Sequence, residues 1–405
     1  MSSLVGVAVL AAVSVTAAVG AGGCHAAPGA SPPTTLGLPQ ALSYDAVFVA
    51  CGPDNAIEVI NAETQVRTPS AIFLENTSFP HYMTLSHDRS KLIVTAGVVG
   101  LATQANTGAA NAALALDAAD GGAEDAGGGA EDGGGGAPDA GPPTGNDAGA
   151  VNEGAVLVLN AATGVTIRGA FTGTASLNTV FGPDETELWT AQGGSPGKAL
   201  VLLANSLATK TTVDVQNGPT HVSISSNGRY AFVVNAGSNS VSAIDTVSKK
   251  VTSTLPVGKD PLTTAQGSNG LAYVESADKT LTAIDAQSLV VKRTYDLGFT
   301  AGAAAYGPDG SVWVTDFTNG KVVLFDANSS LRQRDIDTGA GAYGVTFSAD
   351  GKKAYVSNQL ANTVSVIDVP QRKVIVRIPV GNRPNWVLFR AKDKGSTAGA
   401  GDGGG

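Results

Sequence analysis

Two histidines and two aspartates are the residues of this 405-residue chain whose types and spacing could do acid–base or metal chemistry. His81 stands in the segment FPHY and His221 in GPTH, one position apart when the repeats described below are aligned. Asp260, in GKDP, and Asp316, which ends VWVTD, fall at the same end of their repeats. Two imidazoles and a carboxylate could bind a metal ion or transfer protons. The histidines belong to the second and fourth repeats, however, and this separation favours two strand-end residues over one shared metal site.

Residues that differ between otherwise similar repeats are further candidates for a ligand site. Arg383 and Trp386 lie in GNRPNW, before and within the last strand-like segment. We predict a ligand-binding face with the following members: His81, His221, Asp260, Asp316, Arg383 and Trp386. Cys51 ends the apolar segment AVFVAC, a context typical of a buried, unreactive thiol. No nucleophile elbow, HExxH, phosphate loop or dinucleotide fingerprint stands in the right context, so the sequence predicts no catalytic residue, no metal and no cofactor.

The first 24 residues have the pattern of a bacterial lipoprotein signal. Leu4–Val19 is an apolar run too short for a transmembrane helix, and the residues AGG precede Cys24 as in a lipobox. We predict a signal peptide over residues 1–23, lipidation at Cys24 and a flexible tether over residues 24–43. The protein would then be extracytoplasmic and lipid-anchored to the bacterial envelope, and the residue after the cysteine, which is not Asp, favours the outer membrane. Because MSSLVG has no Lys or Arg, an ordinary secretory signal or a hydrophobic anchor stays open.

Negative charge is concentrated in one segment of the chain. The formal net charge is −9, and residues 101–152 hold eight Asp or Glu and no Lys or Arg. The remainder is nearly neutral and lacks clustered basic residues, so we predict no nucleic-acid partner. The acidic segment is mostly Gly and Ala and cannot bury enough apolar surface to fold, which predicts a disordered insertion over residues 98–153. It lacks the spacing of calcium-binding loops, and a mobile acidic flap over a ligand site or a tolerated low-complexity loop are the alternatives.

Repeats of about 42 residues account for most of the chain. The clearest copy is SADGKKAYVSNQLANTVSVIDVPQRKVIVRIPVG, over residues 348–381. Each copy has an Asp or Asn that closes its third strand-like segment, where short polar side chains start turns by binding local backbone N–H groups. These residues are Asn61, Asn160, Asn205, Asp245, Asp285, Asp326 and Asp368. Their spacings are 99, 45, 40, 40, 41 and 42, and the first becomes ordinary once the insertion is removed.

Three segments carry a resemblance to a known repeat. AYVSN at residues 354–358, FVVN at 232–235 and VWVTD at 312–316 resemble the YVTN-type (YncE-like) β-propeller repeat. With seven units, the resemblance implies an all-β, seven-bladed propeller of four-stranded blades over residues 44–392. The first unit lacks its opening strand, and NWVLFRAK after the last unit is a spare one, so we expect strands from both termini to close the ring. A Gly-rich tail over residues 393–405 is predicted to be disordered.

The sequence favours a binding role over an enzymatic one. We predict a membrane-tethered, monomeric, non-catalytic propeller that binds an unidentified ligand or envelope protein. Propellers that resemble this one include sugar-lactone lactonases, so a lactonase-like hydrolase with its site at one end of the ring is the first alternative. The second alternative is an accessory subunit that docks a periplasmic redox or envelope complex, which an exposed apolar patch around Trp386 would favour.

Overall fold

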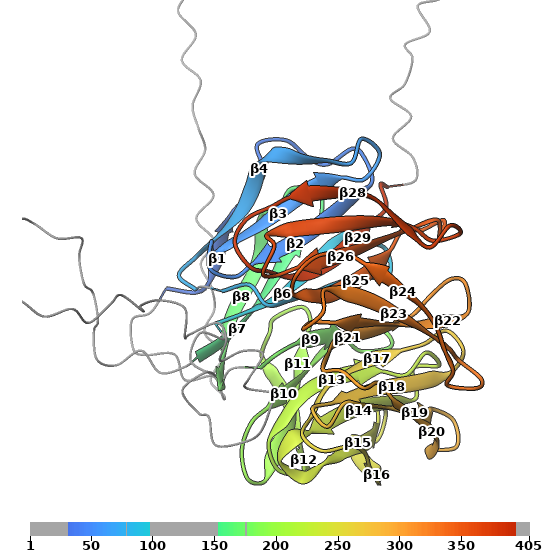
Figure 1. Cartoon of the computed structure of the whole chain (residues 1–405). Coiled ribbons are helices and arrows are strands. Elements are labelled where there is room, and N and C mark those ends of the chain that lie inside the picture. Colours follow the sequence, from blue (N-terminus) through green and yellow to red (C-terminus); the bar gives the residue numbers. More distant parts are fainter. Residues whose placement is uncertain (1–30, 78, 98–152, 175, 394–405) are drawn as a thin grey trace, which may run out of the picture.

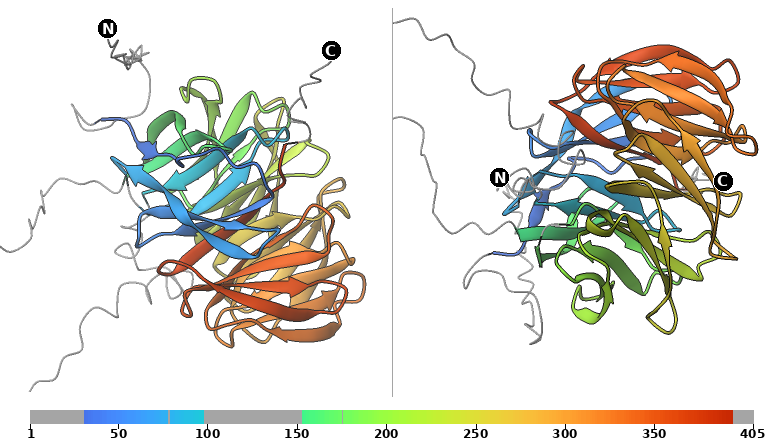
Figure 2. Two further views of the ribbon diagram at one scale, coloured as in Figure 1. Left: turned by 90° about the horizontal axis from the view of Figure 1, so that it is seen from above. Right: turned by 60° about the horizontal axis from the view of Figure 1, so that its bottom comes forward.

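Seven antiparallel β-sheets stand around a common axis in the computed structural model, which describes residues 31–77, 79–97, 153–174 and 176–393 (Figures 1 and 2). Each sheet is one blade of a β-propeller, and we number the blades 1 to 7 along the chain. In blades 2 to 7 the four strands follow one another in chain order, from the innermost to the outermost. The predicted fold class is confirmed. The predicted signal peptide, Cys24, nearly all of the insertion and the tail after residue 393 lie outside the described residues.

The blades contain the following strands. Blade 1 has β1 (Thr34–Leu36), β2 (Ala46–Cys51), β3 (Ala56–Asn61), β4 (Val66–Glu75) and β29 (Pro384–Arg390). Blades 2 and 3 have β5 (Tyr82–Leu85), β6 (Lys91–Ala96), β7 (Glu153–Asn160), β8 (Thr166–Thr174), β9 (Thr179–Phe181), β10 (Glu187–Gln192), β11 (Gly197–Leu203) and β12 (Thr209–Val215). Blades 4 and 5 have β13 (Pro219–Ile224), β14 (Tyr230–Asn235), β15 (Ser240–Asp245), β16 (Lys250–Pro256), β17 (Pro261–Gln266), β18 (Leu271–Ser276), β19 (Thr280–Asp285) and β20 (Val290–Asp296). Blades 6 and 7 have β21 (Ala301–Tyr306), β22 (Ser311–Asp316), β23 (Lys321–Asp326), β24 (Arg332–Asp337), β25 (Ala342–Phe347), β26 (Lys353–Asn358), β27 (Thr363–Asp368) and β28 (Lys373–Pro379).

The hydrophobic core of the ring lies between the blades. The buried apolar residues form seven clusters, and each cluster joins one pair of adjacent blades, including blades 7 and 1. The middle strands are therefore covered on both faces, which explains why a strand such as β26 (KAYVSN) is rich in β-branched and aromatic residues. The outermost strands lie at the rim of the ring, where exposed residues alternate with covered or partly covered ones, as in β28 (KVIVRIP).

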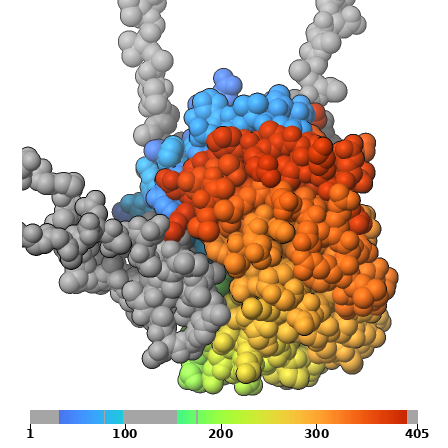
Figure 3. All heavy atoms as spheres, viewed as in Figure 1, coloured from blue at the N-terminus to red at the C-terminus, as the bar shows by residue number. Residues whose placement is uncertain are grey.

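Strands from both ends of the chain close the ring, as the repeat arithmetic predicts. β29 pairs with β2 in antiparallel register, with Val387 opposite Val49 and Arg390 opposite Ala46. The red C-terminal strand accordingly lies beside the blue N-terminal ones in the ribbon, and red and blue atoms meet on the surface (Figures 1 and 3). Closure removes the free inner edge that blade 1 would otherwise present.

The turn role predicted for the repeated Asp and Asn residues is confirmed at six of the seven positions. Asp245 shows the pattern, because its Oδ1 accepts hydrogen bonds from the backbone N–H groups of Val247 and Ser248 at 3.1 and 2.8 Å. Asn61, Asn160, Asp285 and Asp326 accept the same pair of bonds, and Asp368 accepts one, from Gln371 N, because residue 370 is a proline without an N–H. The assignment of Asn205 is wrong, since Leu203 occupies the equivalent place in blade 3, opposite Glu187. The turn of that blade keeps the backbone bond from Leu207 N to Leu203 O, which also occurs in the turns after Asn61, Asn160, Asp245, Asp285 and Asp326, but lacks the side-chain acceptor.

The segment predicted as a flexible tether is ordered in its second half. Thr34–Leu36 forms β1 and adds a fifth strand to the outer edge of blade 1. The chain then contacts blade 2, where Leu38 N donates to Thr163 O at 2.7 Å and Leu42 N donates to Ala162 O at 2.9 Å. An outer edge strand has unpaired backbone groups, and apolar residues after β1 pack against the cluster between blades 1 and 2. The tether prediction over residues 24–43 is therefore wrong for this part.

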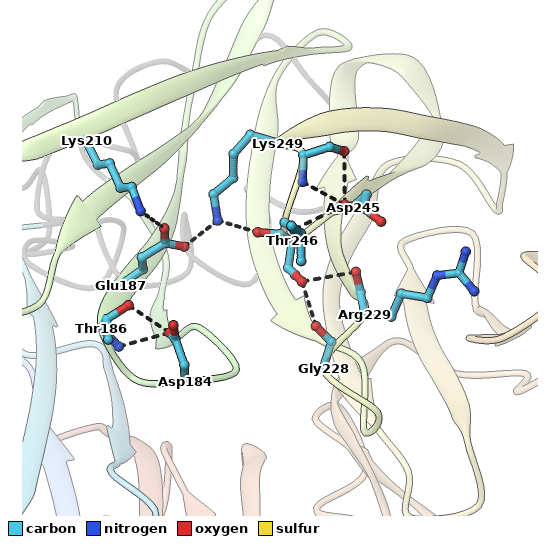
Figure 4. Close-up of polar contacts among 11 residues, drawn as sticks. Asp184, Thr186, Glu187, Lys210, Gly228, Arg229, Asp245, Thr246 and Lys249 are labelled. Atoms are coloured by element: carbon cyan, nitrogen blue, oxygen red, sulfur yellow. Dashed lines mark hydrogen bonds and ion pairs between the residues drawn. The ribbon is translucent and has the colours of Figure 1, made fainter.

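A buried carboxylate joins blades 3 and 4 at the end of β10 remote from the inner-strand starts (Figure 4). Glu187 binds Lys210 of its own blade at 2.6 Å and Lys249 of blade 4. The ammonium group of Lys249 also lies 4.5 Å from the ring centroid of Trp189. Burial raises the pKa of Glu187, but hydrogen bonds and charge from the two lysines outweigh it and hold the pKa below its ordinary value.

Within the described residues, no helix is long and apolar enough to cross a membrane.

Candidate functional site

The innermost strands all begin at one end of the ring axis, which we call the mouth. These strands are β29, β5, β9, β13, β17, β21 and β25, for blades 1 to 7 in order. In blades 1, 2, 4 and 5 the innermost strand lies, near its start, against the second-to-last residue of the second strand. Pairing irregularities in five of the seven blades mark this place, and such bulges turn side chains toward a new direction. The mouth is thus where the sequence can place unusual side chains on a rigid frame.

Three rings gather on one side of the mouth. Trp386, Tyr82 and His221 occupy equivalent positions in blades 1, 2 and 4, opposite Ala50, Thr95 and Val234 respectively. The ring centroids of Tyr82 and Trp386 lie 4.5 Å apart, and those of Tyr82 and His221 lie 5.4 Å apart with an edge-to-face geometry. We call these three residues the aromatic arc. Trp386 and Tyr82 are half-buried, whereas His221 is 3% exposed.

The opposite side of the mouth carries small side chains. The equivalent position is Thr263 in blade 5, and in blades 6 and 7 the place is taken by Ala303 and Gly344. The whole of β21 reads AGAAAY, so its first five residues carry nothing larger than a methyl group. Packing requires a small residue at one of these positions, because a Cβ on Gly302 would lie 2.9 Å from Thr315 Oγ1. At this register position the mouth is consequently asymmetric, with rings in blades 1, 2 and 4 and small side chains in blades 5 to 7.

Both candidate histidines are neutral at pH 7. Burial lowers the pKa of His81 to about 4, only partly offset by its contact with Leu177 O, 3.2 Å from Nδ1. Burial, and then repulsion from His81, lowers the pKa of His221 to about 3. His221 Nδ1 accepts a hydrogen bond from Thr264 N at 3.4 Å, so Nε2 carries the proton, and it is buried without a partner. The structure brings the two histidines close enough to interact, although they belong to non-adjacent blades.

Tyr82 and Asn178 complete this side of the mouth with uncharged polar groups. Burial raises the pKa of Tyr82 to about 12, which keeps its hydroxyl protonated, and Asn178 hydrogen-bonds to it. Asn178 also holds the start of β13, since its Nδ2 and Oδ1 bind Val222 O and N at 2.7 and 2.9 Å. The aromatic arc therefore rests on a fixed frame rather than on loop residues. No group of three or more His, Cys, Asp or Glu side chains in the described part of the chain could hold a metal ion.

Asp260, Arg383 and Asp316 lie at the mouth end in turns. Asp260 and Arg383 both adopt a left-handed backbone, with φ of 46°, and donate their N–H groups to Asn239 and Asn362 of the preceding blade's turn. Asp316 is 2% exposed and closes the turn after β22, accepting from Asn319 N at 3.0 Å and from Asn319 Nδ2 at 2.8 Å. With both carboxylate oxygens engaged in the turn, Asp316 has a structural role in this arrangement.

Glu275 is a mouth residue that the sequence comparison missed. It is the second-to-last residue of β18 and is 1% exposed. Blades 6 and 7 have Thr315 and Ser357 at the same place, and these hydroxyls tie neighbouring inner strands together through Tyr343 O at 2.7 Å and Asn385 O at 3.0 Å. The comparison between repeats used the last residue of each second strand, where Asp316 stands out. The second-to-last residues of these strands, in the series Ala, Thr, Ala, Val, Glu, Thr, Ser for blades 1 to 7, single out Glu275.

Burial raises the pKa of Glu275 to about 8, with only the Ala304 backbone N–H of blade 6 opposing it. Neither carboxyl oxygen has a partner at hydrogen-bonding geometry, so the Ala304 contact is too poorly aligned to satisfy it. Glu275 is therefore an uncharged acid at pH 7 and a hydrogen-bond donor.

Comparison with known proteins shows the fold alone. No protein-family model and no curated protein matches the chain. Among solved structures, a functionally unknown protein from Desulfotomaculum acetoxidans is 11% identical, with a TM-score of 0.62, and the match covers 87% of this chain and 100% of that one. A periplasmic gluconolactonase from Pseudomonas aeruginosa is 16% identical, with a TM-score of 0.61 and coverage of 86% and 99%.

A third match extends this range of functions. The hydrazine synthase of Kuenenia stuttgartiensis is 14% identical, with a TM-score of 0.55, and the match covers 77% of this chain and 95% of that one. Propellers of this shape thus serve proteins of different chemistry, and the YVTN-type resemblance stays a prediction at the level of family.

Proposed function

We propose that this chain is an extracytoplasmic propeller that binds a small, uncharged, ring-shaped ligand at the mouth. The observation that carries the proposal is the aromatic arc, three rings at equivalent ring positions backed by polar groups that are neutral at pH 7. A flat face beside uncharged donors suits a polyhydroxylated ring, because apolar C–H faces pack on aromatic rings while hydroxyls find polar partners. A charged ligand would meet no permanent countercharge among these residues.

Trp386 offers a direct test. Trp189 and Trp313 are completely buried, so Trp386 is the tryptophan positioned to report on a ligand at the mouth. We expect D-glucono-1,5-lactam, a stable neutral sugar ring, to change the fluorescence of the wild-type protein in a saturable way. Trp386→Ala should weaken binding measured by calorimetry by about tenfold, the value of one lost stacking contact. Binding unchanged in Trp386→Ala, or absent in the wild type up to saturation of the probe, would contradict the proposal.

Lactone hydrolysis is the second candidate, and one observation favours it. His221 is neutral, with an unpartnered buried Nε2, and Glu275 beyond it is a neutral acid, so the mouth holds groups that could transfer protons to and from a bound ring. The similarity to a gluconolactonase structure supports asking the question. The assay is hydrolysis of D-glucono-1,5-lactone above its spontaneous rate, and His221→Phe should abolish any activity.

The docking alternative predicted an exposed apolar patch around Trp386. This support is missing, because Trp386 is half-buried against Tyr82.

Membrane tethering remains part of the proposal on the strength of the sequence pattern around Cys24. Cys24→Ala should release the protein from the membrane fraction of the expressing cell. Retention of that variant in the membrane would show that the anchor is not a lipid on this cysteine.

A further inference from the structure

Glu275 differs from the residues at the same place in the other blades. It projects from β18 into the space between the innermost strands of blades 5 and 6, beside Thr263 of its own blade and Ala304 of the next. In blades 6 and 7 the equivalent residues, Thr315 and Ser357, use their hydroxyl groups for hydrogen bonds to the backbone of the inner strands. The carboxyl group of Glu275 makes no such tie, and both of its oxygens are buried without a partner. A buried polar group left unsatisfied in this way destabilises a protein, so its presence calls for a role.

The carboxyl group is fully buried, and the side chains that cover it from blade 6 are small. β21, which faces it, contributes only Ala301, Gly302 and three further alanines before Tyr306. In a ring of seven blades, the boundary between blades 5 and 6 lies opposite blade 2, which carries Tyr82 at the centre of the aromatic arc. Glu275 and the rings of Tyr82 and Trp386 are thus set on opposite sides of the axis at the same end of the propeller.

No charged group acts on this carboxyl. β17 carries no ionisable side chain, and the pKa of Glu275 is set by burial and the Ala304 N–H alone. The ionisable residues of the elements packed around it, none of which contributes, are His221, Tyr273, Asp278, Lys279, Asp285, Tyr306 and Asp316. The chemistry of the position is therefore that of a neutral donor in a site without countercharge.

We propose that Glu275 is the polar anchor of the ligand site, where its carboxyl group donates a hydrogen bond to a carbonyl or ring oxygen of a neutral ring held against Tyr82 and Trp386. This inference rests on the proposed binding function and narrows it to ligands that present an oxygen acceptor to blades 5 and 6. Cationic rings are disfavoured, since they would have to ionise a carboxyl group that burial keeps protonated.

Two probes with the same hydroxyl groups separate these ligand classes. D-Glucono-1,5-lactam is neutral and has a carbonyl acceptor, whereas 1-deoxynojirimycin carries a ring amine that is largely protonated at pH 6, the pH at which the two probes are compared. Calorimetry is carried out on wild type, Glu275→Gln and Glu275→Leu at pH 6, 7, 8 and 9. The amide of Gln keeps a donor, and Leu removes it at similar volume. Glu187→Gln, at the opposite end of β10 from the mouth, is the control for loss of a buried carboxyl group elsewhere.

We expect the wild type to prefer the lactam and to lose about tenfold in affinity between pH 7 and pH 9, as the carboxyl group ionises. Glu275→Gln should bind with a pH-independent affinity, Glu275→Leu should bind about tenfold more weakly at pH 6, and the Glu187→Gln control should match the wild type. Lactam binding that Trp386→Ala weakens but Glu275→Leu does not would refute the anchor and leave the binding function standing. Preference for the amine, with loss in Glu275→Gln, would refute it in favour of a cation site. No binding of either probe to the wild type would overturn both proposals.

Discussion

Replacing Glu275 by Gln should stabilise the protein, and the gain should depend on pH in a defined way. In the unfolded chain the carboxyl group titrates near 4.5, whereas in the folded protein burial raises the pKa to about 8. Between these values the folded state holds one more proton than the unfolded state, so the free energy of unfolding of the wild type falls as pH rises through this window. The glutamine variant has no proton to lose and escapes this fall.

The size of the effect follows from the pKa shift. Each pH unit between 4.5 and 8 removes about 1.4 kcal/mol from the wild type relative to the variant, so the difference is small at pH 4.5 and about 3 kcal/mol at pH 7. Above pH 8 the difference levels off, because the carboxyl group is then ionised in both states. The group is 1% exposed, and no solvent screening reduces the value.

Urea unfolding of both proteins at pH 5, 6, 7 and 8.5, followed by circular dichroism, measures this difference directly. Glu187→Gln is the matched control of opposite sign, because Lys210 and Lys249 hold the pKa of Glu187 below its ordinary value and its loss should destabilise the fold. A pH-independent difference between wild type and Glu275→Gln, or a destabilised variant at pH 8.5, would show that the carboxyl group has a charged partner and that burial does not govern its pKa.

Three further changes test other parts of the structure. The pKa values of His81 and His221 in the folded protein lie near 4 and 3, below the ordinary 6.5. The wild type should therefore lose stability as pH falls below 6.5. In His221→Phe, the slope of the unfolding free energy against pH should be smaller by the equivalent of one proton. Thr315→Val leaves the Ala303 N–H without its acceptor and should cost about 1 to 3 kcal/mol in urea unfolding, whereas a neutral result would mean that water or backbone movement replaces the bond. Asp245→Ala removes two backbone bonds and one from the Ser248 hydroxyl in a turn and should cost about 1 kcal/mol in urea unfolding, whereas Asp245→Asn should keep most of this stability.

The fold could be predicted from the sequence because all the repeats share the same local pattern of strands and turns. Alternating apolar strands and a turn-starting Asp or Asn recur with a period near 42, and seven such units need no information from distant contacts to be placed in a ring. Asn205 shows the limit of this reasoning. Blade 3 has Leu203 where the other blades have Asp or Asn, and Asn205 is the nearest Asn in the sequence. The repeat pattern alone therefore places the turn two residues too late.

The site could be predicted only in part, since it depends on contacts between blades. Residue type and repeat position single out His81, His221 and Trp386 in the sequence, and in the structure His221 and Trp386 both contact Tyr82. That neighbour was not predicted, because a tyrosine in a strand is ordinary in sequence terms. The ordered strand β1 was missed for a similar reason, as its three residues become a strand only beside the edge of β4.

The distribution of exceptions around the ring bears on function more than the repeat itself. Equivalent positions in a propeller face the same structural demand, which is met most simply by the small hydroxyl residues found in blades 6 and 7. At this place Glu275 leaves two buried oxygens unsatisfied, and its raised pKa predicts a loss of about 3 kcal/mol in stability at pH 7 relative to glutamine. Residues that break a local rule at such a cost are concentrated at functional sites. Because this break stands across the axis from the aromatic arc rather than at random in the ring, the two departures from symmetry are best read as the two halves of one binding site.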